Sequence, residues 1–133
     1  MIHLDFHDPR PMYEQVVEQF EMLIARGALA ADEKIPSVRQ LSVQLSLNPN
    51  TVQKAYSELL SRGEIYSVRG KGNFVSGDQT GIRNKKLEQI RGEMLALLRQ
   101  AKEFGASTEQ LQALLTQAEA SARRVQDAVG QGR

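Results

Sequence analysis

The sequence contains no cysteine, and no run of apolar residues approaches the roughly 20 that a membrane-spanning helix needs. The lack of cysteine excludes disulfides, thiolate zinc sites and cysteine nucleophiles, and it fits a reducing compartment. The first ten residues carry Asp5 and Asp8 and have no apolar core, so they are not expected to form a secretory signal. We therefore expect a globular, cytoplasmic protein without membrane association.

Residues that enzymes use for catalysis are also scarce. The two histidines, His3 and His7, lie close together near the start of the chain, and the sequence has no Ser-His-Asp or phosphate-loop pattern. His3 and His7 could hold a metal ion together with Asp5 on an extended segment, although a polar strand or a loose end explains the same pattern without a metal. We predict that the protein is not an enzyme and that it has no catalytic residues, no cofactor and no metal site.

The length and the charge pattern suggest a small domain with one basic face. A chain of 133 residues can form one ordinary domain, or a domain of about 70 to 80 residues with an appendage that needs a partner surface. The net charge of +1 hides an uneven distribution. Residues 1–33 contain two basic and seven acidic side chains, whereas residues 34–75 contain six basic and two acidic ones. Such a contrast is expected where one face of a domain meets a polyanion, with chance clustering on a solvated surface as the alternative.

Hydrophobic periodicity predicts a first helix from about Pro11 to Arg26. Apolar side chains recur on one face at steps of three and four residues, and Gly27 suits the left-handed residue that follows a helix end. The carboxylates of this helix, at residues 14, 18 and 21, are expected on a solvated face. The residues of the apolar face are Tyr13, Val16, Val17, Phe20, Leu23 and Ile24.

Two further helices are predicted to follow each other closely. Ser37 can cap the first of them, with Gln40 completing a capping box, and this helix should end near residue 45 or 46. Asn48-Pro49 supplies a second cap and a proline at the first helical position, so the third helix should run to about residue 62, before Gly63. Two capped helices joined by about three residues form a helix-turn-helix pattern. The inner face of the third helix is expected to contain Val52, Ala55, Tyr56, Leu59 and Leu60.

The period changes after Gly63. Residues 64–68 and 73–76 are β-prone and flank Arg69-Gly70-Lys71-Gly72, which predicts a β-hairpin with a basic, glycine-rich tip. A hairpin that follows a helix-turn-helix is a wing. Residues 77–82 are polar and have no period, which indicates a linker.

The expected fold class is therefore mainly α with a small β-wing. It consists of a winged helix-turn-helix over residues 1–76, the linker over residues 77–82, and a two-helix dimerisation region over residues 83–133.

The two C-terminal helices have a heptad pattern. The first should end at Gly105, and Ser107 with Gln110 can cap the second. Each helix carries a narrow apolar seam, and a hairpin of this size cannot bury enough apolar surface to offset its ordering entropy. We predict a homodimer held together by these seams, with packing onto the N-terminal domain of the same chain as the alternative. The predicted seam residues are Leu87, Ile90, Met94, Leu97, Ala101 and Phe104 in the first helix and Leu111, Leu115, Ala118, Ala122 and Val125 in the second.

Three short segments carry side chains that suit DNA binding. Asn and Gln at the start of the third helix can pair with adenine, and Thr and Lys can contact bases or phosphates. The positive start of the second helix suits a phosphate, and the glycines of the wing tip let its backbone approach DNA between two cations. A helix cap or a tight turn would need some of these residues without DNA. The predicted DNA-binding residues are Ser37, Arg39, Asn48, Asn50, Thr51, Gln53, Lys54, Arg69, Gly70, Lys71 and Gly72.

In order and spacing, these motifs resemble the winged helix-turn-helix domain of the GntR family of bacterial transcription regulators. The resemblance covers residues 11–75, about half of the chain, and rests on the segments Pro11-Met12-Tyr13-Glu14-Gln15, Ile35-Pro36-Ser37-Val38-Arg39-Gln40-Leu41, Asn48-Pro49-Asn50-Thr51-Val52, Ala55-Tyr56 with Leu59, and Arg69-Gly70-Lys71-Gly72 with Phe74-Val75.

The resemblance implies operator binding as a two-fold dimer. It places the family's DNA contacts at Ser37, Arg39, Asn50, Thr51, Gln53, Arg69 and Gly70. Some subfamilies have an arginine where Pro49 stands, so their base preference is not transferred to this protein. The short two-helix tail resembles the YtrA-like subfamily, in which similar helices dimerise and the regulated genes are often transport operons.

We therefore expect a sequence-specific DNA-binding transcription regulator whose partners are double-stranded DNA and a second copy of the chain. Repression is the default expectation, because a protein that occupies a promoter blocks polymerase. The sequence does not identify a small-molecule effector. The alternative is a winged helix that binds another protein, for which exposed apolar residues would be expected at the start of the third helix and at the wing tip.

Overall fold

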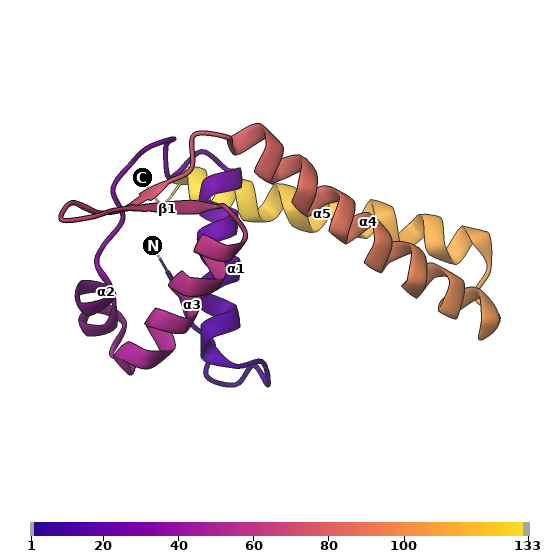
Figure 1. Cartoon of the computed structure of the whole chain (residues 1–133). Coiled ribbons are helices and arrows are strands. Elements are labelled where there is room, and N and C mark those ends of the chain that lie inside the picture. The colour runs from indigo at the N-terminus through magenta and orange to yellow at the C-terminus, as the bar shows by residue number, and fades with distance from the viewer. Residues whose placement is uncertain (1, 132–133) are drawn as a thin grey trace. The chain divides into compact units, whose positions relative to one another are not determined.

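The computed structural model describes residues 2–131, with side chains described up to residue 124. Two compact units are present, over residues 1–86 and 87–133. Figure 1 shows the elements along the chain, and α4 begins in the first unit and continues into the second. Within the described residues the elements are α1 (Met12–Ala25), α2 (Val38–Leu45), α3 (Pro49–Ser61), β1 (Ile65–Val68), β2 (Gly72–Val75), α4 (Gln79–Glu103) and α5 (Thr108–Gln131). The expected fold class, mainly helical with a small β-wing, is confirmed.

The first unit, which we call the winged unit, is built around the packing of α1 against α3. The predicted apolar faces of these helices supply most of its core, and the rings of Phe20 and Tyr56 meet edge to face with their centroids 5.7 Å apart. Leu60 was predicted on the inner face of α3, but it is exposed, because it lies about 100° around the helix from the fully buried Leu59. The buried core contains Val16, Val17, Phe20, Ile24, Leu29, Ile35, Leu41, Val52, Ala55, Tyr56, Leu59, Ile65 and Val75.

The predicted boundaries of the first three helices are confirmed to within two residues. Ser37 Oγ accepts a hydrogen bond from the Gln40 amide, and Gln40 Oε1 accepts one from the Ser37 amide, so the capping box is formed. Gly27 and Gly63 follow their helices with φ of +75° and +72°. Pro11 differs slightly from expectation, because its extended backbone caps α1 instead of forming its first turn. Local capping chemistry therefore determines where these helices begin and end.

The wing is an antiparallel hairpin of β1 and β2 in which Ile65 pairs with Val75 and Val68 pairs with Gly72. Its tip is a turn closed by a hydrogen bond from the Lys71 amide to the Val68 carbonyl, 2.9 Å. Gly70 occupies the third position of this turn with φ of +77°, which favours glycine. The predicted wing, with Arg69 and Lys71 at its tip, is confirmed.

The predicted linker is shorter than expected, because α4 begins at Gln79 and not near residue 83. Asp78 caps this helix, and its Oδ1 accepts a hydrogen bond from the Gly81 amide at 3.0 Å. The Gln79 side chain donates a hydrogen bond to the Leu29 carbonyl at 3.0 Å. The first turn of α4 contains no apolar residue before Ile82, so hydrophobic periodicity could not detect it.

The second unit, which we call the helical hairpin, contains the rest of α4 and α5. The predicted cap of α5 is formed, with Ser107 and Gln110 exchanging two hydrogen bonds. Up to residue 124, no side chain of this unit is buried. Val125, the last predicted seam residue, lies outside the described side chains. No helix among the described residues is long and apolar enough to cross a membrane.

Candidate nucleic-acid interface

The start of α3 presents a row of exposed polar side chains. Asn48 caps the helix, and its Oδ1 accepts a hydrogen bond from the Asn50 amide at 2.8 Å. The side chains of Asn50 and Gln53 are exposed, and Thr51 is half-buried. Pro49 at the first helical position leaves no amide hydrogen that would need a partner there. The start of α3 can therefore offer amide and hydroxyl groups to a groove of DNA while its opposite face lies in the core.

The start of α2 is held next to α3 by a buried tyrosine. Tyr56 donates its hydroxyl hydrogen bond to the Pro36 carbonyl, 2.6 Å away, directly before the cap residue Ser37. Burial raises the pKa of Tyr56 far above its ordinary value, so this hydroxyl remains a donor. Arg39 lies two residues after Ser37, in the first turn of α2, and is exposed. This hydrogen bond joins the middle of α3 to the backbone directly before the start of α2.

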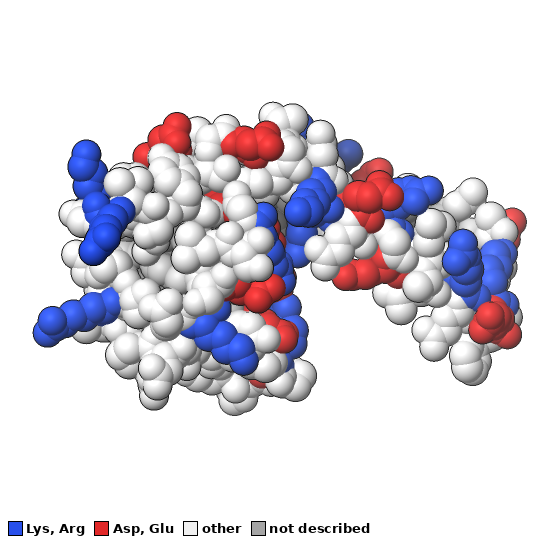
Figure 2. All heavy atoms as spheres, viewed as in Figure 1, with Lys and Arg blue, Asp and Glu red and all other residues white. Residues whose placement is uncertain are grey.

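The basic side chains of the winged unit fall into two groups. Arg10, Arg62 and Lys86 form ion pairs with carboxylates. In contrast, no carboxylate among the described residues pairs with Arg39, with Arg69 or with the other wing-tip cation, Lys71. Figure 2 shows basic side chains projecting from the side of the winged unit on which the wing tip, α2 and the start of α3 lie in Figure 1. Arg26, Arg83 and Lys85 also have no carboxylate partner among the described residues, so Arg39, Arg69 and Lys71 are distinguished by their place on the elements where the DNA contacts were predicted.

Lys54 has a more specific environment than the sequence indicated. Its Nζ lies 4.1 Å from the centroid of the Tyr13 ring, a cation–π contact between α3 and α1. The ring lies at the start of α1, which adds this part of α1 to the border of the predicted interface. Sequence reasoning missed this neighbour, because Tyr13 was assigned only to the apolar face of α1.

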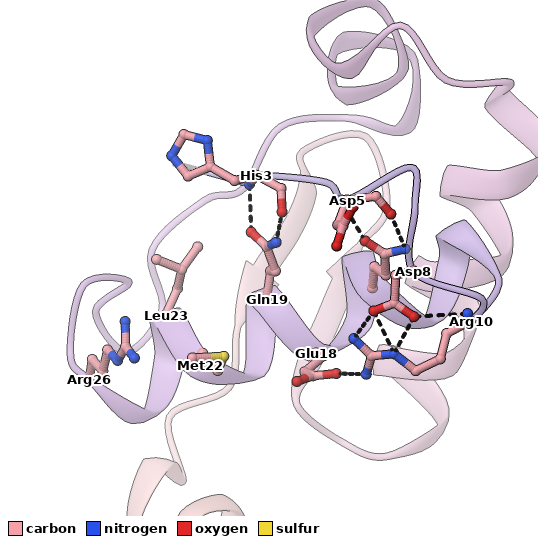
Figure 3. A pocket seen from close by; sticks show the side chains of 10 residues that line it. His3, Asp5, Asp8, Arg10, Glu18, Gln19, Met22, Leu23 and Arg26 are labelled. Atoms are coloured by element: carbon pink, nitrogen blue, oxygen red, sulfur yellow. Dashed lines mark hydrogen bonds and ion pairs between the residues drawn. The ribbon is translucent and has the colours of Figure 1, made fainter. Parts of the chain in front are cut away.

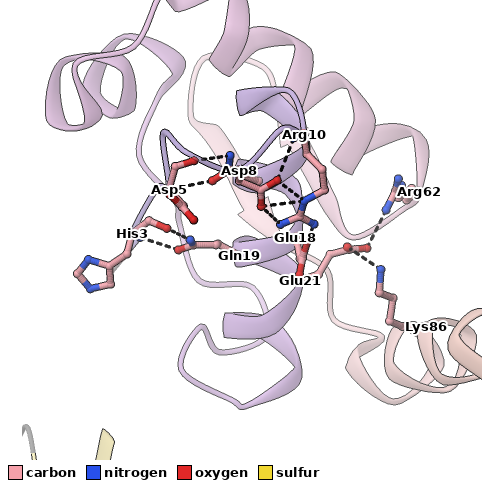
Figure 4. Close-up of polar contacts among 10 residues, drawn as sticks. His3, Asp5, Asp8, Arg10, Glu18, Gln19, Glu21, Arg62 and Lys86 are labelled. Carbon is pink, nitrogen blue, oxygen red and sulfur yellow. Dashed lines mark hydrogen bonds and ion pairs between the residues drawn. The ribbon is translucent and has the colours of Figure 1, made fainter. Parts of the chain in front are cut away.

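Glu21 was predicted on a solvated face, and this prediction is wrong. It is buried beside Glu64, and it forms ion pairs with Arg62 at 3.0 Å and with Lys86 of α4 at 3.2 Å, as Figure 4 shows. Arg62 also pairs with Glu58 at 3.1 Å, so two carboxylates neutralise this cation. Helical spacing alone could not show this, because α4 and the turn before β1 cover this side of α1 only in the folded chain.

The two buried carboxyls of this cluster have opposite pKa shifts. Burial, together with the facing carboxyl of Glu21, raises the pKa of Glu64 to about 8. Burial also acts to raise the pKa of Glu21, but hydrogen bonds with Glu64 and Lys86 and the charges of Lys86 and Arg62 outweigh it, and the pKa of Glu21 is lowered. Oε2 of Glu64 has no hydrogen-bond partner among the described residues. Near neutral pH Glu64 therefore holds a proton, which allows it to donate to the Glu21 carboxylate.

The residues before α1 form an extended segment held by two glutamines. The side chain of Gln15 exchanges hydrogen bonds with the amide and carbonyl of Asp5, both at 2.9 Å, and Gln19 exchanges the equivalent pair with the backbone of His3. Among the residues that the structure describes, no group of three or more His, Cys, Asp or Glu side chains could hold a metal ion. The backbone of His3 and Asp5 thus has a structural role in anchoring this segment to α1.

An open cleft of about 300 Å³ lies between this segment and α1. Figure 3 shows that Arg10 points towards Asp8 and Glu18 at one end, and that Gln19 points towards His3. Hydrogen bonds within the protein therefore engage most of the charged groups at its rim. The cleft is separate from the predicted DNA-binding residues.

The chain matches a known family and several solved structures. The family model described as bacterial regulatory proteins, gntR family, matches residues 12–75. The HTH-type transcriptional repressor YtrA of Bacillus subtilis (strain 168) is 36% identical over 112 residues, covering 84% of this chain and 86% of YtrA. A GntR family transcriptional regulator from Listeria monocytogenes has a TM-score of 0.73 at 30% identity, covering 84% of this chain and 98% of that chain. A structure of AraR(DBD) in complex with operator ORX1 has a TM-score of 0.52 at 35% identity, covering 56% of this chain and 96% of that chain.

The likenesses to YtrA and to the Listeria regulator each cover 84% of this chain, so they extend beyond the winged unit into the helical hairpin. The relatives are named as transcriptional regulators and not as enzymes, which agrees with the prediction made from the sequence. The match covers similar shares of YtrA and of this chain, so the two chains are similar in length, as expected from the short C-terminal tail. The protein belongs to the GntR family of bacterial transcription regulators and resembles its YtrA-like members.

Proposed function

We propose that the protein is a homodimeric repressor that binds an inverted-repeat operator. Each protomer inserts the start of α3 into a major groove, α2 contacts the adjacent backbone, and the wing binds the flanking DNA. The observation that carries this proposal is the grouping of Arg39, Arg69 and Lys71 on α2 and the wing tip. None of these three cations has a carboxylate partner among the described residues. A phosphate backbone supplies the counter-charge that these side chains lack.

The base contacts in this proposal come from the start of α3. Asn50 and Gln53 can each make paired hydrogen bonds to adenine, and Thr51 can contact a phosphate or a thymine methyl group. Arg39 and Lys54 extend this contact on either side, while Ser37 and the glycines Gly70 and Gly72 let the backbone come close to phosphates. The polar and basic character of this surface favours DNA over a protein partner, which would need exposed apolar groups here.

Dimerisation in this proposal rests on the uncovered seams of the helical hairpin. Leu97 is 65% exposed and Leu115 is 61% exposed, although both belong to heptad patterns. Ile90 and Phe104 are exposed in the same way. A second copy of the hairpin provides a matching apolar surface, and two-fold pairing gives the symmetry that an inverted repeat requires.

The proposed role in the cell follows from operator occupancy. The relative YtrA is named as a repressor, and a dimer that covers a promoter excludes polymerase. We propose that this protein acts in the cytoplasm, on the bacterial chromosome, and that its regulated genes include a transport operon, as the YtrA-like tail implies.

The proposal is tested by selecting fragments of genomic DNA from the source organism that bind the purified protein. The best fragment is then titrated at several salt concentrations and compared with random DNA of equal length. We expect an inverted repeat that is bound at least about a thousandfold more tightly than random DNA, with a steep salt dependence and two protomers per site. Binding without sequence preference would contradict the proposed regulator, and genes next to the recovered site would identify the operon.

A further inference from the structure

The segment before α2 is joined to the outer side of the wing by an isolated β-bridge, which the sequence did not reveal. Lys34 pairs with Phe74 in an antiparallel β-bridge. On either side of this bridge, the Ile35 amide donates to the Asn73 carbonyl at 3.0 Å and the Val75 amide donates to the Glu33 carbonyl at 2.9 Å. Backbone hydrogen bonds therefore hold Lys34 rigidly against β2.

The side chain of Lys34 lies over a glycine of the wing. A Cβ atom at Gly72 would lie 3.0 Å from Cε of Lys34 and 3.8 Å from its Nζ. Gly72 also has φ of +122°, a conformation that side-chain-bearing residues rarely adopt. The absence of a side chain at Gly72 thus leaves room for the Lys34 stem, and the Lys34 ammonium group lies next to the wing tip.

The same bridged segment leads directly into α2. Lys34 precedes the cap residue Ser37 by three positions, and between them the Pro36 carbonyl is anchored by the Tyr56 hydroxyl. Ile35 is buried, so its neighbour Lys34 points out of the core and is exposed. No carboxylate among the described residues pairs with Lys34. An unpaired cation therefore stands between the wing tip and the start of α2.

We propose that Lys34 is a further DNA contact, which binds a backbone phosphate between those bound by the wing tip and by the start of α2. This inference rests on the proposed function, because it requires that both flanking elements face DNA. The β-bridge holds the Lys34 backbone and the packing over Gly72 restricts the lysine stem, so less side-chain entropy is lost when the ammonium group binds a phosphate. Lys34 joins the wing contact and the α2 contact into one continuous basic surface.

The test measures binding to the selected operator over a range of salt concentrations for the full-length protein with Lys34→Met, Lys34→Arg or no substitution. Methionine keeps the length of the stem and removes the charge. Lys34→Met is expected to weaken binding about three- to tenfold near 0.1 M salt and to reduce the slope of log K against log salt by about 1, the value for one lost phosphate contact. Lys34→Arg should retain the slope. Lys85→Met, which removes an exposed lysine of α4, is the matched control and should bind like the parent protein.

Ethylation of single phosphates provides a second readout. Ethylation of one phosphate between the wing contacts and the α2 contacts should weaken the parent protein and leave Lys34→Met unaffected. An unchanged salt slope and ethylation pattern in Lys34→Met would overturn the contact while leaving the proposed function intact. A parent protein without specific DNA binding would overturn both. A purely structural role for Lys34 would lower the melting temperature of Lys34→Met without changing the salt slope, and that result would also reject the contact.

Discussion

The two units of this chain use the same local chemistry and reach opposite outcomes in packing. Each has a helix that begins with a Ser and Gln capping box, formed by Ser37 with Gln40 and by Ser107 with Gln110. The winged unit buries a complete apolar core, whereas the helical hairpin buries no side chain up to residue 124. Capping defines a helix, but only a second apolar surface gives it tertiary stability.

The difference lies in the width of the apolar face. The faces of α1 and α3 are broad, and they are covered by each other and by β1 and α2. The heptad seams of α4 and α5 are narrow, and most of their large side chains stay exposed. We infer that the winged unit is stable without a partner and that the helical hairpin depends on one.

The largest effect on the difference in stability between the two units is expected when a core side chain of the winged unit is truncated. Leu59 is fully buried, so Leu59→Ala should lower the free energy of unfolding of the winged unit by about 2 to 5 kcal/mol, through lost burial and a cavity. Leu60→Ala on the same helix is the matched control, and because Leu60 is partly exposed its loss should be much smaller. Urea denaturation measures both variants, and equal losses would contradict the described core.

The second prediction concerns the seams of the helical hairpin. Replacing Leu97 and Leu115 together by Glu should convert the dimer to monomer at micromolar concentration, because charges would be buried in the interface. Operator affinity should fall by about a hundredfold, since each protomer then binds a half-site alone. Sedimentation and titration with operator DNA measure the two effects.

Gln100→Glu with Gln112→Glu, two exposed polar positions on the same helices, is the control for added charge and should remain dimeric. A dimer that survives the changes at Leu97 and Leu115 would show that the seams do not form the interface. The melting temperature of the winged unit should be the same in both double variants.

A smaller effect is expected from the buried acid pair of the winged unit. Because the pKa of Glu64 is raised from 4.5 to about 8, its contribution to stability is complete below pH 4.5 and is lost as the pH rises through 8. Glu64→Gln keeps a hydrogen-bond donor towards Glu21 without a titrating proton, so it should stabilise the protein by about 1 to 2 kcal/mol at pH 8.5 and have little effect at pH 4.5.

Thermal unfolding of this variant across the pH range provides the measurement. Glu93→Gln, at an exposed position in the helical hairpin, is the control and should follow the pH dependence of the parent protein. A Glu64→Gln variant that loses stability equally at all pH values would contradict the proton assigned to Glu64.

The smallest effect is expected at the two capping boxes. Ser37→Ala should lower the stability of the winged unit by about 1 kcal/mol, because the Gln40 amide loses its acceptor. Ser107→Ala removes the equivalent bond in the helical hairpin and should leave the unfolding transition of the winged unit unchanged. Unfolding of both variants is measured without DNA, which distinguishes the stabilities of the two units. Equal shifts in the transition of the winged unit would show that the two units unfold together.

Much of the fold could be predicted because its signals are local. Ser37, Gly27 and Gly63 mark helix ends through hydrogen bonds and backbone conformations within a few residues. The hairpin and its turn likewise follow from β-prone runs on either side of Gly70. The predicted DNA-binding residues fall on these same elements, so their positions on helix starts and at the wing tip were also evident from the sequence.

The sequence by itself therefore determined the elements of this protein, their order, and the segments that carry polar and basic side chains for DNA. Only the tertiary structure decided that Glu21 is buried beside Glu64, that Lys54 lies over Tyr13, and that Lys34 belongs to the wing. The physical reason is that each of these environments is formed by residues about 40 positions apart in the chain. A local pattern records which groups a residue carries, but its neighbours across the fold determine whether that group is buried, paired or free to bind DNA.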